Sequence, residues 1–295
     1  MNSNNLVLSV LNDLRNNYQG IGAFNFSTAE VLRGIVEEVI EEKYPVIVAT
    51  SEHEANFLTL QVAAAMVDSW RKEFNWPIFL NLDHGHSLEI IKKAVLSGYD
   101  MVHFDGSTLS FGENIQKTKE VVDWVRGFEE REKKKIVVEG ELGYLRGSSN
   151  IHREKMEISE EDLTKPEEAK EFIDRTGIDS LAIAIGNIHG IFIHSQQRLH
   201  LDRLREIKKI IGNQAFLVLH GGSGTPTEDL AGAVKDGITK FNFNTELRLA
   251  WSKITRQNFR DNPQEIVPYR LLLPVVEAIK KVVQEKVKIL KGEYL

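Results

Sequence analysis

Residues 180–190 of the chain read SLAIAIGNIHG. Five apolar residues run without interruption from Leu181 to Ile185, and a second run, FLVL, occupies residues 216–219. A strand that is apolar at every position is typical of a parallel sheet whose two faces are covered by helices. Polar residues follow each run directly, as GNIHG after the first and HGGSG after the second. The two runs therefore predict buried parallel strands whose carboxyl ends carry polar side chains.

The same arrangement repeats along the chain. Short apolar, β-branched runs alternate with longer amphipathic segments, as expected for parallel βα units. Residues 28–42, for example, place Val31, Ile35 and Val39 on one face of a helix. Eight such strands favour closure over an open sheet, so the expected fold class is α/β, a (β/α)₈ TIM barrel. The predicted strands are Ile21–Phe26, Pro45–Thr50, Pro77–Asp83, Met101–Ser107, Lys135–Gly143, Ser180–Gly186, Phe216–Gly222 and Lys240–Thr245.

The domain organisation follows from length and the lack of a linker. The chain has 295 residues, close to the roughly 250 that are typical of one such barrel. No Pro-, Gly- or Ser-rich segment divides it, so we expect residues 1–295 to form a single domain. Two additions to a minimal barrel are predicted. A polar stretch, Tyr144–Lys165, follows the fifth strand, and an extra C-terminal helix runs roughly from Tyr269 to Leu290.

Composition excludes several functional classes. The chain contains no cysteine, so a metal ion would have to be held by His, Asp or Glu. The net charge of −6 disfavours nucleic acid and anionic membrane surfaces as partners. The N-terminal residues MNSNNLVLSV do not resemble a secretory signal, and no apolar run reaches the length of a membrane span. We therefore expect a cytoplasmic protein that binds neither nucleic acid nor membrane.

Histidines mark the ends of three predicted strands. His84, His189 and His220 follow different strands, and the carboxyl ends of all strands meet at one rim of a barrel. A lone histidine at such a place is most often structural, but three of them match a three-His metal site with one open position. His86 and His103 lie near the same rim and stay ambiguous. The remaining histidines are interpreted as structural: His53, His152, His194 and His200.

Two polar segments at the last strands suggest a phosphate site. Gly-Gly-Ser-Gly at residues 221–224 and Asn-x-Asn-Thr at residues 242–245 offer backbone N–H groups, a hydroxyl and amides. Barrels frequently hold phosphate at the loops after strands seven and eight. The alternative is a glycine turn that only starts the next helix at Thr227.

Seven ordered motifs carry a resemblance to a known family. GAFNFS, LDHGHS, FDGS, VEGELG, LAIAIGNIHGIF, LVLHGGSG and KFNFNTELR together span nearly the whole chain. They resemble the class II, metal-dependent fructose-bisphosphate and tagatose-bisphosphate aldolases. That resemblance implies a lyase of carbohydrate metabolism, glycolysis included, that cleaves a phosphorylated ketose and releases dihydroxyacetone phosphate. It further implies a homodimer or homotetramer.

The resemblance also assigns roles to residues. His84, His189 and His220 would bind Zn²⁺ or another divalent metal, and Asp83 would be the catalytic acid/base. Asp105 and Glu141 match a second metal site, and a monovalent cation, Na⁺ or K⁺, is a further cofactor of the family. Substrate and its phosphate would be bound by Gly190, Gly221, Ser223, Asn242 and Thr245, with Asn25, Ser51 and Asn244 as additional candidates.

The chain departs from the family pattern at four places. Ser149 stands where the family has a loop Glu base, and Glu154 is a candidate substitute. No lysine follows the strand-six motif, and Gly140 replaces the usual Ala. Leu273 and Val276 occupy the positions expected for the arginine that holds the distal phosphate, and Arg270 is out of register. A lost bidentate arginine removes a contact worth about 1.5–3 kcal/mol. We therefore expect a substrate whose far end is uncharged.

Three other functions stay open at this point. A class I aldolase needs a Schiff-base lysine, but Leu181–Ile185 contains none and Lys240 is predicted at the entrance to strand eight, away from the rim. A metal-dependent hydrolase could use the pair His84-Gly85-His86. A barrel without the loop base could serve as a sugar-phosphate-binding protein.

Overall fold

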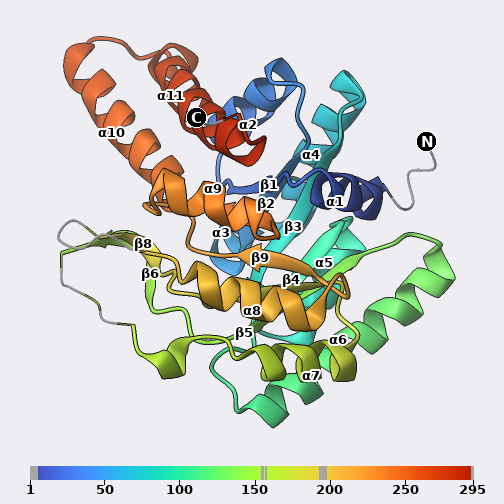
Figure 1. The fold of residues 1–295 in the computed structure, drawn as a ribbon. Coiled ribbons are helices and arrows are strands. Elements are labelled where there is room, and N and C mark those ends of the chain that lie inside the picture. Colours follow the sequence, from blue (N-terminus) through green and yellow to red (C-terminus); the bar gives the residue numbers. More distant parts are fainter. Residues whose placement is uncertain (1–5, 154–155, 157, 193–197, 294–295) are drawn as a thin grey trace.

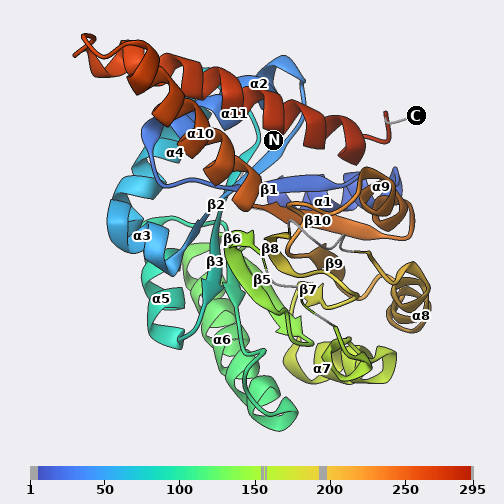
Figure 2. The ribbon, with the colours of Figure 1, turned by 90° about the vertical axis from the view of Figure 1, so that its left-hand side faces the viewer.

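Eight parallel strands surround the centre of the molecule and close on themselves (Figures 1 and 2). The computed structural model describes residues 6–153, 156, 158–192 and 198–293. The barrel order is β1-β10-β9-β7-β5-β4-β3-β2, and the pairing of Phe24 with Phe243 belongs to the closing ladder. The strands are β1 (Ile21–Asn25), β2 (Val46–Ser51), β3 (Ile78–Gly85), β4 (Met101–Phe104), β5 (Val137–Leu142), β7 (Ser180–Ile183), β9 (Phe216–Leu219) and β10 (Ile238–Phe243). The predicted (β/α)₈ barrel and all eight of its strands are confirmed.

Helices cover the outside of the barrel. Their buried faces hold the apolar residues that the helical period predicts, as Val31, Ile35 and Val39 show in the helix at residues 29–41. A helix precedes the first strand, and two helices link β2 to β3. The helices are α1 (Leu6–Asn16), α2 (Ala29–Glu41), α3 (Glu52–Leu58), α4 (Leu60–Phe74), α5 (Leu88–Ser97), α6 (Phe111–Glu132), α7 (Pro166–Thr176), α8 (Leu201–Ile211), α9 (Thr227–Lys235), α10 (Thr245–Asp261) and α11 (Pro268–Leu290).

The C-terminal helix α11 is the predicted addition to the barrel, and it packs along α2 and α10 (Figure 2). Gly34 of α2 makes the close approach possible. A Cβ atom there would lie 2.8 Å from the Cβ of Ile279 and 2.9 Å from the carbonyl oxygen of Val276. A larger residue at position 34 would therefore force the two helices apart.

A second, small sheet was not predicted. β6 (Gly147–His152) and β8 (His189–Phe192) pair in parallel outside the barrel. The polar stretch after β5 thus contains a strand, followed by a 3₁₀ turn at Glu160–Asp162. The sheet holds the segment that carries His189 against the segment that contains Ser149.

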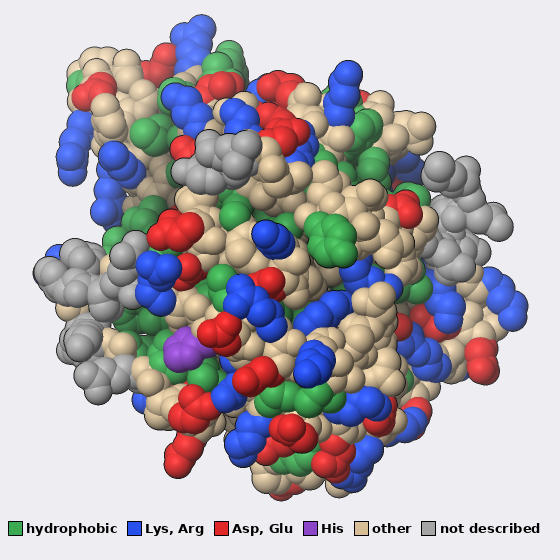
Figure 3. All heavy atoms as spheres, in the orientation of Figure 1, with side chains coloured by type: hydrophobic (Ala, Val, Ile, Leu, Met, Phe, Trp, Pro, Cys, Tyr) green, Lys and Arg blue, Asp and Glu red, His purple; other side chains and the backbone are tan. Residues whose placement is uncertain are grey.

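Surface features agree with the modest net charge. Acidic and basic side chains are interspersed over the face drawn in Figure 3, whereas a nucleic-acid-binding face gathers Lys and Arg. None of the helices in the described residues has both the length and the hydropathy that crossing a bilayer requires.

Candidate functional site

Three predicted histidines meet at the carboxyl end of the barrel. The ring centroid of His84 lies 4.7 Å from that of His220 and 5.0 Å from that of His189, and the last two are 6.2 Å apart. All three line one cavity of about 300 Å³, together with Asp83. His84 lies near the end of β3, His189 begins β8 and His220 follows β9, so three distant stretches of chain supply one site.

The orientation of two rings suits a cation. The Nδ1 atom of His84 lies 2.7 Å from Asp105 Oδ2, and the Nε2 atom of His220 lies 2.8 Å from Glu139 Oε1. These carboxylates hold the protons of His84 Nδ1 and His220 Nε2, so that His84 Nε2 and His220 Nδ1 would be the atoms that bind a metal once the remaining proton between them is lost. The two atoms face each other at 3.1 Å. Two nitrogens bound to one tetrahedral zinc ion at about 2.0–2.1 Å would be roughly 3.3 Å apart, so these residues fit a divalent metal.

His103 belongs to the same cluster, but its ring makes different contacts. Asp83, His84, His103 and His220 offer ligand atoms that all lie within 4.8 Å of one another. The Nδ1 atom of His103, however, accepts the backbone N–H of His84 at 3.1 Å, and its Nε2 lies 3.1 Å from Glu141 Oε2. His103 is fully buried and does not line the cavity, whereas His189 does. It holds the backbone of His84, whose φ of 51° is unusual for a residue other than glycine.

Asp83 is fixed by two amides. The Nδ2 atom of Asn25 donates to Asp83 Oδ2 at 3.0 Å, and that of Asn242 donates to Asp83 Oδ1 at 2.9 Å. Burial by itself raises the pKa of Asp83, but the neighbouring His84 and His220 bring this pKa well below its ordinary value. Asp83 is therefore charged and held in a fixed orientation at the cavity.

The imidazoles divide into one that is positively charged and two that are neutral. Burial lowers the pKa of His84, but Asp83 and the hydrogen bond to Asp105 overcome this effect and raise it to about 10. Burial, assisted by His84 and His220, lowers the pKa of His189 to about 3. Burial also lowers the pKa of His220. The cluster thus accepts positive charge at His84 and keeps the other two rings neutral.

Asp105 and Glu141, predicted as a second metal site, lie on the far side of the His84 ring. The Nδ1 atom of His84 is 2.7 Å from Asp105 Oδ2 and 3.8 Å from Glu141 Oε2. Their ligand atoms lie within 4.8 Å of one another, so the three side chains form a second group that could hold a cation. His84 belongs to both groups.

The predicted phosphate residues line the same cavity. Gly190, Gly221, Ser223, Asn242, Asn244 and Thr245 all contribute to its wall. The Oγ atom of Ser223 accepts the backbone N–H groups of Asn244 and Glu246, at 3.3 and 3.4 Å, at the start of α10. Gly221 has a φ of 66°, and a Cβ atom there would lie 2.3 Å from the carbonyl oxygen of Ile188. A helix N-terminus beside small residues is a common site for an anion.

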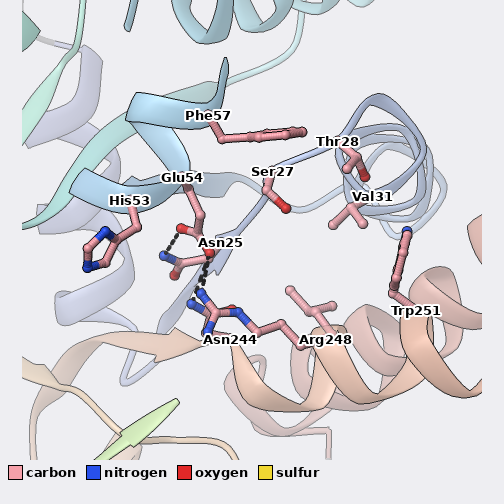
Figure 4. Close-up of a pocket in the computed structure, with 11 residues that line it drawn as sticks. Asn25, Ser27, Thr28, Val31, His53, Glu54, Phe57, Asn244, Arg248 and Trp251 are labelled. Carbon is pink, nitrogen blue, oxygen red and sulfur yellow. Dashed lines mark hydrogen bonds and ion pairs between the residues drawn. The ribbon is translucent and has the colours of Figure 1, made fainter. Parts of the chain in front are cut away.

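Glu54 holds several residues that line the cavity by hydrogen bonds, and it was not predicted from the sequence. Its carboxylate accepts Nδ2 of Asn25 at 2.9 Å, the backbone N–H of Ser51 at 2.8 Å and Nδ2 of Asn244 at 3.3 Å. It also pairs with Nη2 of Arg248 at 2.7 Å (Figure 4). Arg248 in turn donates to the carbonyl oxygen of Ser149 at 3.2 Å. The three additional substrate candidates are therefore held by one buried carboxylate.

One expectation about a basic residue was wrong. Lys240 does not lie apart from the site: it is buried inside the barrel, and its Nζ is 2.7 Å from Glu139 Oε2, one residue removed from His220. The inward face of β10 explains this, since Lys240 and Asn242 are two positions apart on one strand. Leu273 and Val276 do not line the cavity. Leu273 is half exposed, and Val276 is buried where α11 meets α2.

Other candidates separate in space. His86 is exposed and does not line the cavity, so it forms no pair with His84. His53, interpreted as structural, does line the cavity, as do Ser148, Ser149 and Asn150. Asp83 is the one carboxylate among the described lining residues. Glu154, the suggested substitute base, and His194 lie outside the described residues.

Comparison with known proteins decides among the open functions. The model of the family "Fructose-bisphosphate aldolase class-II" matches residues 5–293. The chain belongs to this family. The aldolase superposes on the crystal structure of the YdjI aldolase from Escherichia coli K12 with a TM-score of 0.81 and 32% identity, over 96% of each chain. It matches a fructose-bisphosphate aldolase structure from Campylobacter jejuni with a TM-score of 0.79 over 98% of this chain and 94% of that chain; at 19% identity this shows the fold alone.

The protein is thus a metal-dependent aldolase, a lyase that acts on phosphorylated sugars. The hydrolase and class I alternatives are excluded by this assignment. The lysine that a Schiff base would need is also occupied, because Lys240 is buried in an ion pair with Glu139.

Proposed function

We propose that this aldolase cleaves a ketose 1-phosphate into dihydroxyacetone phosphate and an aldehyde, with zinc held by His84, His189 and His220. The observation that carries the proposal is the pair of facing nitrogens, His84 Nε2 and His220 Nδ1, at the floor of an open cavity. A divalent ion held there would polarise the ketone carbonyl and stabilise the electron pair released by C–C cleavage. As the family resemblance implies, we further propose a cytoplasmic homodimer or homotetramer that also uses Na⁺ or K⁺.

Asp83 is proposed to move the proton. In cleavage its carboxylate takes the proton of the C4 hydroxyl, the C3–C4 bond breaks, and C4 becomes the carbonyl carbon of the aldehyde. The electron pair of the broken bond stays on the three-carbon fragment, which takes up one proton at C3 from solvent to become dihydroxyacetone phosphate. Asn25 and Asn242 keep both carboxylate oxygens in place for this transfer. The lowered pKa of Asp83 keeps it in the form that accepts a proton.

The donor phosphate is proposed to sit at the start of α10. Gly190, Gly221 and Ser223 face that helix end with Asn242 and Thr245 across one cavity. Backbone N–H groups there would receive the phosphate oxygens, since small residues let the ligand approach the chain. Asp105 and Glu141 are proposed to hold a second, non-catalytic cation beside His84, in the arrangement described above.

A ketose monophosphate is proposed because the described residues of the cavity offer no unpaired arginine or lysine for a second phosphate. Among the described residues that line it, Arg248 is the one arginine, and its guanidinium is already paired with Glu54. A distal phosphate would have to compete with that carboxylate.

The test compares fructose 1-phosphate with fructose 1,6-bisphosphate as substrates of the zinc-reconstituted protein. We expect a higher kcat/KM for the monophosphate. We expect His220→Ala to lose both zinc and turnover, and His86→Ala, an exposed histidine outside the cavity, to retain both. A strong preference for the bisphosphate would refute the monophosphate proposal. Bound zinc without turnover on any phosphorylated ketose would instead favour a sugar-phosphate-binding protein.

A further inference from the structure

A second cavity, of about 330 Å³, opens beside the metal-binding cavity. Figure 4 shows residues that line this second cavity. The two share Asn25, His53, Asn244 and Arg248, so they are compartments of one depression. We call the second compartment the side chamber. Its volume is at the lower end of the roughly 300–1,000 Å³ of small-molecule sites, enough for a ring or a short chain.

The side chamber has an apolar wall. Val31 from α2, Phe57 from α3, and Leu247 and Trp251 from α10 surround it. Phe57 is 73% exposed, although it is a large aromatic residue beside a cavity. The hydroxyl oxygen of Thr28, which also lines the chamber, is buried without a hydrogen-bond partner. An apolar group bound against the four apolar side chains would remove apolar surface from water, which favours binding.

The charges of the chamber do not favour a phosphate. Its cation, Arg248, is held at 2.7 Å by Glu54, so the pair contributes no net charge. A further carboxylate stands behind the wall, where Nε1 of Trp251 donates to Oε1 of Glu30 at 2.7 Å. A phosphate monoester, which carries about −1.5 to −2 charges at neutral pH, would meet carboxylates and, among the described lining residues, no unpaired lysine or arginine.

From these contacts we infer that the side chamber binds the far end of the aldehyde and selects an uncharged, apolar tail. This inference rests on the proposed aldol function, because the aldehyde carbon must lie at the metal-binding cavity for its tail to reach the chamber. Asn25 marks the junction, since its amide bonds to Asp83 on one side and to Glu54 on the other. Phe57 and Trp251 are the residues proposed to determine specificity.

The experiment measures condensation of dihydroxyacetone phosphate with three aldehydes: phenylacetaldehyde, glyceraldehyde and glyceraldehyde 3-phosphate. We expect the wild-type kcat/KM to be highest for phenylacetaldehyde and lowest for glyceraldehyde 3-phosphate. Phe57→Ala should lower kcat/KM for phenylacetaldehyde by about tenfold with little change for glyceraldehyde, because lost apolar contact acts only on the apolar tail. Phe57→Lys should move the preference toward glyceraldehyde 3-phosphate, since it adds an unpaired cation.

Phe259→Lys is the matched control, because Phe259 is also an exposed phenylalanine and lies on α10 outside the chamber. It should leave the order of the three aldehydes unchanged. Turnover with no preference among the aldehydes, or equal effects of Phe57→Lys and Phe259→Lys, would overturn the inference alone. No condensation with any aldehyde by the zinc-loaded protein would overturn the proposed function and this inference with it.

Discussion

Replacing Lys240 by methionine should destabilise the protein and weaken its metal site together. Lys240 and Glu139 are both buried inside the barrel, with Nζ and Oε2 2.7 Å apart. The substitution keeps most of the side-chain volume but leaves the Glu139 carboxylate without its cation. Removing one partner of a buried ion pair costs about 3–5 kcal/mol. The remaining Glu139 carboxylate would be buried away from water with only its hydrogen bond to His220 as support. We expect the free energy of unfolding of the metal-free protein to fall by that amount in urea titrations.

The effect on metal binding follows from the second oxygen of Glu139. Its Oε1 lies 2.8 Å from Nε2 of His220 and fixes the orientation of that ring. Burial raises the pKa of Glu139, whereas Lys240 is the strongest of the groups that lower it. Without Lys240 the carboxylate becomes easier to protonate and holds the ring less firmly. Loss of such a supporting contact typically weakens metal affinity by about 10–100-fold, which competition with a chromophoric chelator would measure.

Two comparison variants make the stability result decisive. Glu139→Gln combined with Lys240→Met removes both charges, and we expect it to recover most of the lost free energy of unfolding. Lys119→Met removes one partner of an exposed pair, with Asp123, and should cost less than about 1 kcal/mol. A Lys240→Met variant no less stable than Lys119→Met would refute the reasoning.

Further predictions concern the proton and the metal. Asp83→Asn should lower kcat by about 10²–10⁴ while zinc binding is retained, because Asp83 is proposed to transfer a proton and not to bind the metal; a wild-type kcat would contradict this role. The pKa of His84, raised to about 10 in the metal-free protein, means that a second proton occupies the ring at neutral pH. A metal ion must displace it, so apparent metal affinity should fall by about tenfold for each unit that the pH is lowered. Calorimetry in two buffers of different ionisation enthalpy would detect the released proton, and binding without proton release would contradict the assignment.

The barrel could be predicted from the sequence because its signal is local and repeated. Each strand is a short apolar run, and the connection rule for parallel strands brings all carboxyl ends to one rim. That rule correctly predicted that Asp83, His84 and His220 lie together, although β3 and β9 are far apart in the sequence. The small sheet of β6 and β8 lacked such a signal, since residues 147–152 are mostly polar and pair with a segment about forty positions away.

Supporting contacts were harder to predict than ligands. Glu54 and Arg248 are 194 positions apart, and nothing in either helix indicates that they pair. Lys240 could have been placed correctly, since alternation along KFNFN puts Lys240 and Asn242 on one face of β10. The apolar wall of the side chamber could not have been predicted from the sequence, because Phe57 and Trp251 come from helices whose relative position depends on the closed barrel.

Anomalous diffraction at the zinc absorption edge, from crystals of the zinc-loaded protein, would examine the metal centre directly. We predict a zinc peak bonded to nitrogens of His84, His189 and His220, with its remaining position open to the cavity that Asp83 lines. A peak enclosed by protein ligands on all sides, or the three rings directed at different points with no metal between them, would contradict the catalytic assignment.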